Sequence, residues 1–338
     1  MLTVFPESFD RTATAAVWKV GEGEARYKLD AIVKRSLLLY DPEKDRYRLH
    51  DSVHPVARYF IDGRIRKSNP ARQPNFLVEA AARHAAHYET VLRTADRLYQ
   101  QGDEELERGL EQFDFEWRNI QVGQAWAENH SKENDKAAEL CSAYADAGVS
   151  LLGLRRHPTE QIGWFEAALT ATRRLNDPGG EIAHLGNMAS LYTDLGKTSR
   201  AIELYQRRLE IARDIGNRQD ESKIMSDLGL AYATLGETNR AIEIYEQALA
   251  IDREMNNRQG ERAILTNLGN AYFTSSEFHR AVEVYQQALA IASELGDRQG
   301  EGETLSNMGY AHATLGQASQ AIKFYEQSLP LLRKSGDR

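Results

Sequence analysis

The chain has 338 residues, of which 41% are hydrophobic and 27% are charged, and its formal net charge is −8. This length predicts about two domains, and the composition is ordinary for a helix-rich globular protein. The single cysteine, Cys141, excludes an internal disulfide; we expect it to be a core residue and the protein to be cytoplasmic. The sequence has no run of about 18 apolar residues that could span a membrane and no signal-peptide pattern. The acidic balance argues against a nucleic-acid role for the whole chain.

Residues 1–70 have the pattern of a small separate domain. The pattern predicts two short helices, a β-hairpin and a third helix, over the ranges 9–18, 28–38, 38–41 with 46–50, and 51–65. One face of the second helix would carry Leu29, Ile32, Val33 and Leu37. Helix, helix, hairpin, helix is the order of a winged helix without its opening helix. We therefore expect a truncated winged-helix domain here.

A helical spacer is predicted over residues 71–145. Residues 66–74 carry two prolines and no apolar periodicity, which predicts a linker. Helical patterns follow over 76–101, 104–112 and 115–130, with Gly102 ending the first. An aromatic-rich cluster in this spacer is expected to be core: Phe113, Phe115, Trp117, Ile120, Val122 and Trp126.

The rest of the chain repeats itself. Closely similar segments start at Gly186, Ser226, Thr266 and Ser306, a constant spacing of 40 residues. Such a period is the signature of a solenoid. Each segment contains two amphipathic helical patterns. Small residues recur in them, and we expect these to lie at close helix crossings that large residues fill: Gly229, Gly269, Gly309, Ala201, Ala241, Ala281 and Ala321 against Tyr205, Tyr245, Tyr285 and Tyr325.

These segments resemble the tetratricopeptide repeat. The resemblance rests on a set of residues that recurs in each segment. In the second segment these residues are Leu228, Gly229, Tyr232, Gly236, Ala241, Tyr245 and Ala248. The units are longer than the common form of about 34 residues, as in kinesin light chains, Leu-Gly-Asn-type polarity adaptors and bacterial signalling ATPases. A weaker unit over 146–185 keeps Phe165, Ala168 and Leu169. The resemblance implies an all-α right-handed superhelix over 146–338, with a concave groove lined by the first helix of each pair.

The candidate site is this groove. One residue per repeat forms a polar ladder, with a second series three residues on: Asn187, Asp227, Asn267 and Asn307, then Ser190, Leu230, Asn270 and Tyr310. An amide both donates and accepts hydrogen bonds, which suits the backbone of an extended peptide. The alternative is that these residues only cap or solvate helices. Lys223 is the sole basic residue near the middle of the ladder, so a carboxylate clamp is not evident.

Other clusters of charged residues and histidines are expected to stabilise the fold and not to form a site. The turn residues Arg218, Arg258 and Arg298 each lie three residues before a glutamate. This spacing predicts ion pairs with Glu221, Glu261 and Glu301, and the alternative is a role in ligand binding. The histidine pairs His84 with His87 and His50 with His54 lack a third ligand at fixed spacing, so no metal site is expected. No catalytic triad can be nominated, and we expect no enzyme activity.

A second resemblance concerns the end of the hairpin. Residues Arg48-Leu49-His50-Asp51, followed by Val53, Val56, Ala57 and Phe60, resemble the Met-His-Asp motif that closes the winged helix of NB-ARC-type (STAND) signalling ATPases. Leu49 stands in place of Met, and the stretches 4–10 and 29–37 also resemble bacterial members. The resemblance implies that His50 would contact the β-phosphate of ADP and that Asp51 would order the turn, at a junction that favours anions.

The phosphate-binding string G-x-x-x-x-G-K-[ST] does not occur in this sequence. The nucleotide-binding core would then precede Met1, and we expect no ADP or ATP binding by this chain alone. The predicted function is that of a sensor or scaffold, which binds a protein or peptide and relays it through the winged helix to that core. The alternative is a transcription regulator using Arg26, Lys28, Lys34 and Arg35 on DNA, with a wing of Lys44, Arg46 and Arg48.

The last repeat ends without a polar capping helix, which solenoids usually need. The winged helix also lacks its opening helix. We therefore expect both ends to be cut, the chain being either a piece of a larger protein or a partial gene product. The exposed apolar end face should self-associate, and it would include Leu315, Ile322, Tyr325 and Leu329.

Overall fold

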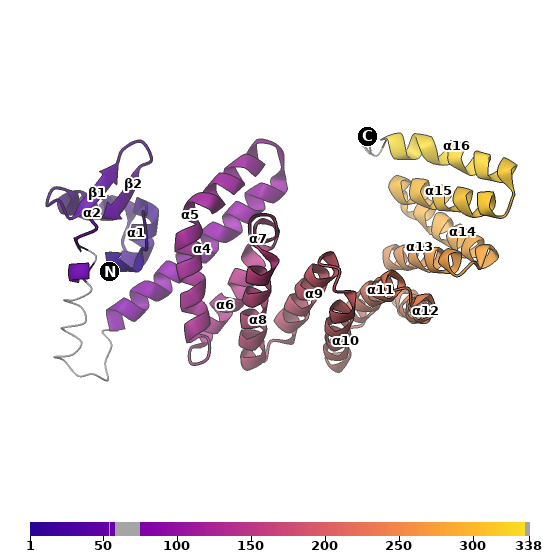
Figure 1. Cartoon of the computed structure of the whole chain (residues 1–338), viewed down its shortest axis with the longest axis horizontal. Coiled ribbons are helices and arrows are strands. Elements are labelled where there is room, and N and C mark those ends of the chain that lie inside the picture. The colour runs from indigo at the N-terminus through magenta and orange to yellow at the C-terminus, as the bar shows by residue number, and fades with distance from the viewer. Residues whose placement is uncertain (54, 58–74, 335–338) are drawn as a thin grey trace. The chain divides into compact units, whose positions relative to one another are not determined.

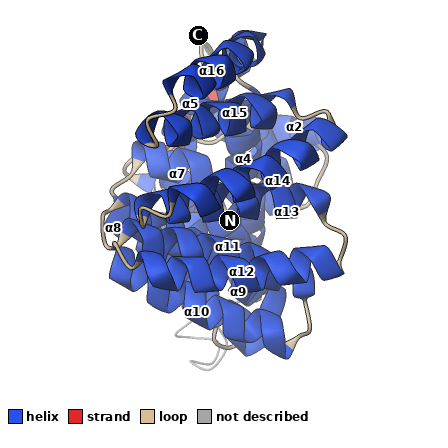
Figure 2. Ribbon diagram, turned by 90° about the vertical axis from the view of Figure 1, so that its right-hand side faces the viewer, coloured by secondary structure: helices blue, strands red, loops and turns tan. Residues whose placement is uncertain are grey.

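The computed structural model describes residues 1–53, 55–57 and 75–334. These residues are mostly helical, and they contain one two-stranded hairpin (Figure 1, Figure 2). The chain divides into two compact units, Met1–His184 and Leu185–Arg338. Each unit has its own set of packed helices.

The first unit begins with five short elements. The helix α1 starts where the Asp10 carboxylate accepts a hydrogen bond from the Ala13 N–H at 2.6 Å, as a helix cap does. The two strands pair antiparallel with Leu38 opposite Leu49, which confirms the predicted hairpin. The elements are η1 (Leu2–Val4), α1 (Arg11–Trp18), α2 (Glu22–Val33), β1 (Leu38–Asp41) and β2 (Arg46–Leu49).

The prediction for the second helix was wrong at both ends. The helix starts at Glu22 instead of residue 28, in a stretch where glycines hide the helical pattern, and two glutamates in its first turn favour the start. It ends at Val33 because Ser36 takes a left-handed backbone with φ of 57°, so Leu37 lies outside the helix and is exposed. Of the third predicted helix, Val53 and residues 55–57 are helical; its remainder and the linker at 66–74 lie outside the described residues.

Five longer helices complete the first unit. Gly102, with φ of 77°, separates the first two as predicted. The helices expected at 104–112 and 115–130 are instead one continuous helix, because no residue between them breaks the helical pattern. The five helices are α4 (Asn75–Gln101), α5 (Asp103–His130), α6 (Asp135–Ala147), α7 (Val149–Arg155) and α8 (Pro158–Leu175).

The N-terminal elements and these helices share one apolar core. Phe5 stacks on Phe9 and meets Tyr88 of α4 edge-on, and all three side chains are buried. In the aromatic cluster of the spacer, Phe113 and Ile120 are buried as expected, whereas Phe115 and Val122 are exposed and do not belong to the core. Cys141 is buried, in agreement with the prediction.

A buried ion pair joins the hairpin to α5. The Arg46 guanidinium bonds both carboxylate oxygens of Glu116, with Nη2 at 3.0 Å from Oε2, and it also donates to the Ser8 carbonyl at 2.8 Å. Asn119 donates to the same carbonyl at 3.0 Å. The side chains of Arg46 and Glu116 are 7% and 9% exposed. The hairpin therefore cannot leave α5 without uncovering two charges.

The repeats confirm the period of 40 residues. First helices begin at residues 178, 218, 258 and 298, and second helices at 198, 238, 278 and 318. One period earlier, α8 begins at residue 158, and α6 with α7 occupies the place of a first helix that is interrupted at Gly148. The helices are α9 (Pro178–Asp194), α10 (Thr198–Asp214), α11 (Arg218–Thr234), α12 (Thr238–Glu254), α13 (Arg258–Thr274), α14 (Phe278–Leu295), α15 (Arg298–Thr314) and α16 (Ala318–Lys334).

Small and large residues interlock within each pair, as predicted. A Cβ placed on Gly229 would lie 2.5 Å from Cε1 of Tyr245, whose side chain is 1% exposed, so only glycine allows this ring to pack so closely. Ala189 takes the glycine position in the first pair, and the facing Tyr205 is less deeply buried. The alanines of the other crossing are buried in all four pairs: Ala201, Ala241, Ala281 and Ala321.

The turns between helices also repeat. Asn217, Asn257 and Asp297 each accept a hydrogen bond from a backbone N–H three residues on, which caps the first helix of the next pair. First helices end at a left-handed residue that is Gly196, Gly236 or Gly316 in three pairs and Ser276 in the other.

Candidate functional site

The first helices of the second unit form a common surface. Successive first helices contact each other, α11 with α13 and α13 with α15, whereas no comparable contact joins successive second helices within residues 185–334. The first helices are therefore the closer layer, which is expected on the inner side of a curved stack. We call their exposed surface the first-helix face. It carries Asn187, Asp227, Asn267 and Asn307, which are half-buried, and Ser190, Leu230, Asn270, Tyr310 and Lys223, which are exposed.

Two asparagines of this face are linked across repeats. The Tyr285 hydroxyl donates to Asn270 Oδ1 at 2.6 Å, and Asn307 Nδ2 donates to the same oxygen at 3.3 Å. These bonds orient both amides, so the Asn270 NH₂ group and the Asn307 carbonyl oxygen remain for a ligand. The amides of Asn187 and Asn267 have no hydrogen-bond partner among the residues that the structure describes. The ladder is thus linked diagonally, from Asn307 to Asn270, and not level by level.

A half-buried arginine reaches the other end of the face. Arg208 lies on the second helix α10, and its Nη1 is 3.1 Å from Asp227 Oδ2. Its side chain is 11% exposed, and its Nε has no hydrogen-bond acceptor. Burial raises the pKa of Asp227 above its ordinary value, while the charges of Arg208 and Lys223 oppose this rise.

The sequence interpretation missed Arg208 because only first-helix residues were considered. The available signal was a break in the period: the equivalent positions hold Ala248, Ala288 and Ser328. Arg208 is a second basic residue beside the ladder, so the prediction that Lys223 is the sole one near its middle is wrong.

Aromatic side chains cluster beside the two linked asparagines. The ring of Phe273 lies 4.9 Å from that of Tyr310 and 5.1 Å from that of Phe278, measured between centroids. Tyr310 is 59% exposed, and the two phenylalanines are half-buried. These three residues join the ends of α13 and α14 to α15 on one surface.

The turn arginines have the predicted structural role in two repeats. Arg218 pairs with Glu221 and Arg258 with Glu261, both at 2.6 Å. Each glutamate is also held at 2.8 Å by a second arginine, Arg213 or Arg253. In the last repeat, no ion pair between Arg298 and Glu301 is found among the described residues, and Ser293 stands where the second arginine would be.

His50 lies where it was expected, between β2 and the next helical residues. Its Nδ1 accepts a hydrogen bond from the Ser52 N–H at 3.3 Å, so the neutral ring carries its proton on Nε2. The imidazole is exposed, and Asp51 lies 3.8 Å from Arg48. The exposed ring therefore presents an N–H donor at this junction.

In the other histidine pair, His84 is buried and His87 is half-buried. His84 lies against Phe5 and Tyr88, and burial lowers its pKa to about 4. Within the described ranges, no group of three His, Cys, Asp or Glu side chains could hold a metal ion. Among the helices of those ranges, none is both long enough and apolar enough to cross a membrane.

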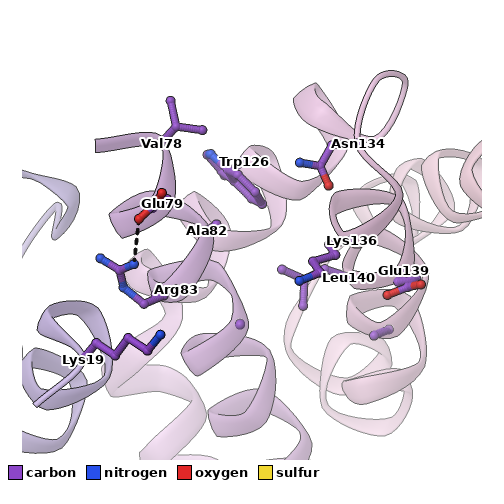
Figure 3. Close-up of a pocket in the computed structure, with 12 residues that line it drawn as sticks. Lys19, Val78, Glu79, Ala82, Arg83, Trp126, Asn134, Lys136, Glu139 and Leu140 are labelled. Atoms are coloured by element: carbon purple, nitrogen blue, oxygen red, sulfur yellow. Dashed lines mark ion pairs between the residues drawn. The ribbon is translucent and has the colours of Figure 1, made fainter. Parts of the chain in front are cut away.

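The first unit contains a separate open cavity of about 880 Å³ (Figure 3). Apolar side chains from α4, α5 and α6 line it, including Trp126 and Leu140. Arg83 lies on its rim, 3.6 Å from Glu79, and donates through Nε to the Val17 carbonyl at 2.7 Å. Arg83 and Glu79 therefore have structural partners within this unit.

The predicted apolar end face is partly formed. Ile322 and Leu329 of α16 are exposed, while Leu315 and Tyr325 are half-buried. Self-association through this face remains a prediction.

Comparisons with known proteins agree with the repeat geometry. Residues 180–254 and 261–334 match the tetratricopeptide repeat. No curated protein sequence matches the chain. Three solved structures illustrate the likeness, all under 25% identical and so informative about the fold alone.

BtubC (BKLC) from P. vanneervenii has a TM-score of 0.54 at 19% identity, over 77% of this chain and 93% of that one. Aspartyl phosphate phosphatase F from Bacillus subtilis has a TM-score of 0.58 at 14% identity, over 76% and 75%. A STAND protein with a tetratricopeptide-repeat sensor from Pyrococcus horikoshii has a TM-score of 0.50 at 14% identity, over 100% and 59%. The chain is thus a mostly helical tetratricopeptide-repeat array with a small N-terminal hairpin.

Proposed function

We propose that this tetratricopeptide-repeat array is a sensor or scaffold that binds a protein or peptide ligand on the first-helix face. The observation that carries the proposal is the linked pair Asn270 and Asn307, which offers one donor and one acceptor side by side. A peptide unit presents the complementary C=O and N–H groups, so an extended chain can satisfy both amides. The chain itself would do no chemistry.

The experiment is selection of peptides on the full chain, followed by fluorescence anisotropy with Asn270→Ala and Asn307→Ala. Each lost hydrogen bond contributes about 1 kcal/mol, so each variant should weaken binding about five- to tenfold. Gln247→Ala on the second helix α12 is the matched control, since it removes an exposed amide away from the face. Equal affinity of the asparagine variants and the control would refute the proposal.

A finer proposal concerns the purpose of binding. We infer that the chain is the sensor region of a STAND-type ATPase, in which ligand binding is relayed through a winged helix at residues 1–70 to a nucleotide-binding module. Support comes from the Leu49-His50-Asp51 motif, the free Nε2–H of His50, and the likeness of the whole chain to part of a STAND protein. The energetic requirement is only that the ligand prefers one arrangement over the other.

In this reading His50 would supply one donor to the β-phosphate of ADP, and the phosphate-binding loop would come from the nucleotide module. Isothermal titration of this chain alone with ADP should therefore give no measurable heat. Micromolar affinity would overturn the assignment, because it would require a phosphate site within these residues.

The alternative of a DNA-binding regulator has weaker support. Of the basic residues named for it, Arg46 is buried against Glu116 and Lys28 pairs with Glu24 at 2.6 Å. A salt-dependent shift of duplex DNA by the full chain, lost on Arg26→Ala and Arg35→Ala, would restore this alternative.

A further inference from the structure

The repeat period provides an internal standard for the first-helix face. Residues needed for stacking recur every 40 positions, as the tyrosine does in all four pairs and the facing glycine in three of them. Residues that break the period on the surface are not required by the stack. Such departures gather in two places on the face, one between α9 and α11 and the other between α13 and α15.

The first place is cationic. Arg208 replaces the buried alanine of α12 and α14, which puts a charge where the stack needs none. Gly186 makes room for it, since a Cβ at that position would lie 3.0 Å from the Arg208 Cζ, and the other repeats have Ser or Thr there. Arg208 and Lys223 both act on the Asp227 carboxylate, and among the described residues neither has a second ion-pair partner. The Arg208 Nε also lacks an acceptor.

The second place is aromatic. Phe273 stands where other repeats have Thr193, Ala233 and Ala313, and Phe278 stands where they have Thr198, Thr238 and Ala318. Tyr310 replaces Ser190, Leu230 and Asn270. All three departures bring a ring to one surface, beside the amide pair proposed to hold a peptide backbone. Such a platform suits a large apolar or aromatic side chain.

We propose that the first-helix face selects an extended peptide carrying an acidic side chain, which binds at Arg208 and Lys223, and an aromatic side chain, which binds on Phe273 and Tyr310. This rests on the peptide-binding function proposed above and deepens it. The charge of the cationic place complements a carboxylate, which Arg in particular recognises through several N–H donors.

The spacing of the two side chains follows from the stack. The two places are two helix-to-helix steps apart, about 16–20 Å at packing distances of about 8–10 Å. They are offset by about four residues along the helix axes, roughly 6 Å. The diagonal is roughly 17–21 Å, which an extended chain covers in about five or six residues.

The test uses fluorescein-labelled decapeptides of Ser and Ala that contain one Glu and one Phe. In the wide-spacing probes Glu and Phe are five or six residues apart, with either residue first. In the narrow-spacing probes they are two residues apart. Matched control probes carry Gln in place of Glu or Ala in place of Phe. Anisotropy with the full chain should show the wide spacing, in at least one order, binding about tenfold more tightly than the narrow spacing or either matched probe. Affinity independent of the spacing, the Glu and the Phe would overturn the inference.

Two variants restore the residues of other repeats and should fold. Arg208→Ala should remove the preference for Glu over Gln while keeping that for Phe over Ala, and Phe273→Ala should do the reverse. Misfolding cannot produce this crossed result, and equal loss of both preferences in each variant would refute the assignment. If selected library peptides bind but none of these probes does, the inference fails while the proposed function stands. If Asn307→Ala weakens the binding of every probe by the same factor, the result supports the proposed peptide-binding function and does not test the selectivity for Glu and Phe.

Discussion

Removal of the Glu116 carboxylate is the most severe single test of the first unit. In Glu116→Ala the Arg46 guanidinium stays buried and keeps only the Ser8 carbonyl at 2.8 Å, the Ser8 hydroxyl at 3.4 Å and the partly exposed Asp10 at 3.8 Å. Breaking a buried pair by removing one partner costs about 3–5 kcal/mol, because the remaining charge is uncompensated.

The expected shift in melting temperature follows from the size of the unit. For about 150–250 residues, 1 kcal/mol moves Tm by about 2–4 °C, so Glu116→Ala should lower Tm by roughly 6–20 °C. The double variant Arg46→Met with Glu116→Leu removes both charges, and Asn119 still donates to the Ser8 carbonyl. We expect it to lie within about 1 kcal/mol of the parent.

The chain contains its own reporter for this experiment. All four tryptophans lie within Met1–His184, so tryptophan fluorescence follows the first unit while circular dichroism follows both. Glu105→Ala is the control on the same helix, since its pair with Arg108 is exposed and should matter by under about 1 kcal/mol.

Two results would refute the reasoning. Glu116→Ala behaving like Glu105→Ala would show that the Arg46 charge is not held away from water. A double variant as unstable as Glu116→Ala would show that the pair itself, and not the stranded charge, supplies the stability.

Three further changes test other parts of the structure. Gly229→Ala should destabilise the array by up to about 2 kcal/mol in thermal denaturation, because crowding of Tyr245 outweighs the gain of about 1 kcal/mol in helix propensity; a stabilised variant would contradict the packing. Ser276→Gly should stabilise it by about 1 kcal/mol, since its φ of 66° favours glycine, and an unchanged Tm would argue against that backbone. Because His84 has a pKa of about 4 when folded and about 6.5 when unfolded, the first unit should lose about 3 kcal/mol as pH falls from 6.5 to 4. In His84→Phe the tryptophan-monitored loss over that range should shrink by this amount, and an identical pH profile would exclude His84 as its source.

The repeat architecture was predictable because the same residues recur at the same offsets. Gly229 and Tyr245 recur together, so the sequence alone predicts that the small residue makes room for the large one. The ends of single elements were less accessible. The start of α2 at Glu22 lies among glycines that weaken the helical pattern. The helix α5 passes through Asp114, where the prediction left a gap between two helices although no helix-breaking residue lies there.

The candidate face was predictable in position but not in detail. Asn307 bonds to Asn270, three residues beyond its counterpart Asn267, because adjacent helices cross at an angle and bring unlike levels together. Arg208 escaped notice because a long side chain can cross from a second helix to the face of the first helices. The one further sequence signal for the position of Arg208 is Gly186, which stands where the other repeats have Ser or Thr.

The turn ion pairs have a consequence for how the array opens. Glu221 and Glu261 each form ion pairs with two arginines, whereas Glu301 has no arginine partner within the described residues. Stability in stacked repeats is set by neighbours, so local opening should be easiest at α15 and α16. Amide hydrogen exchange should then form a gradient that is fastest in these two helices. On warming, the peptide proposed above should lose its contact with Tyr310 before its contact with Arg208. The array should then first lose its selectivity for the aromatic side chain and only later its affinity.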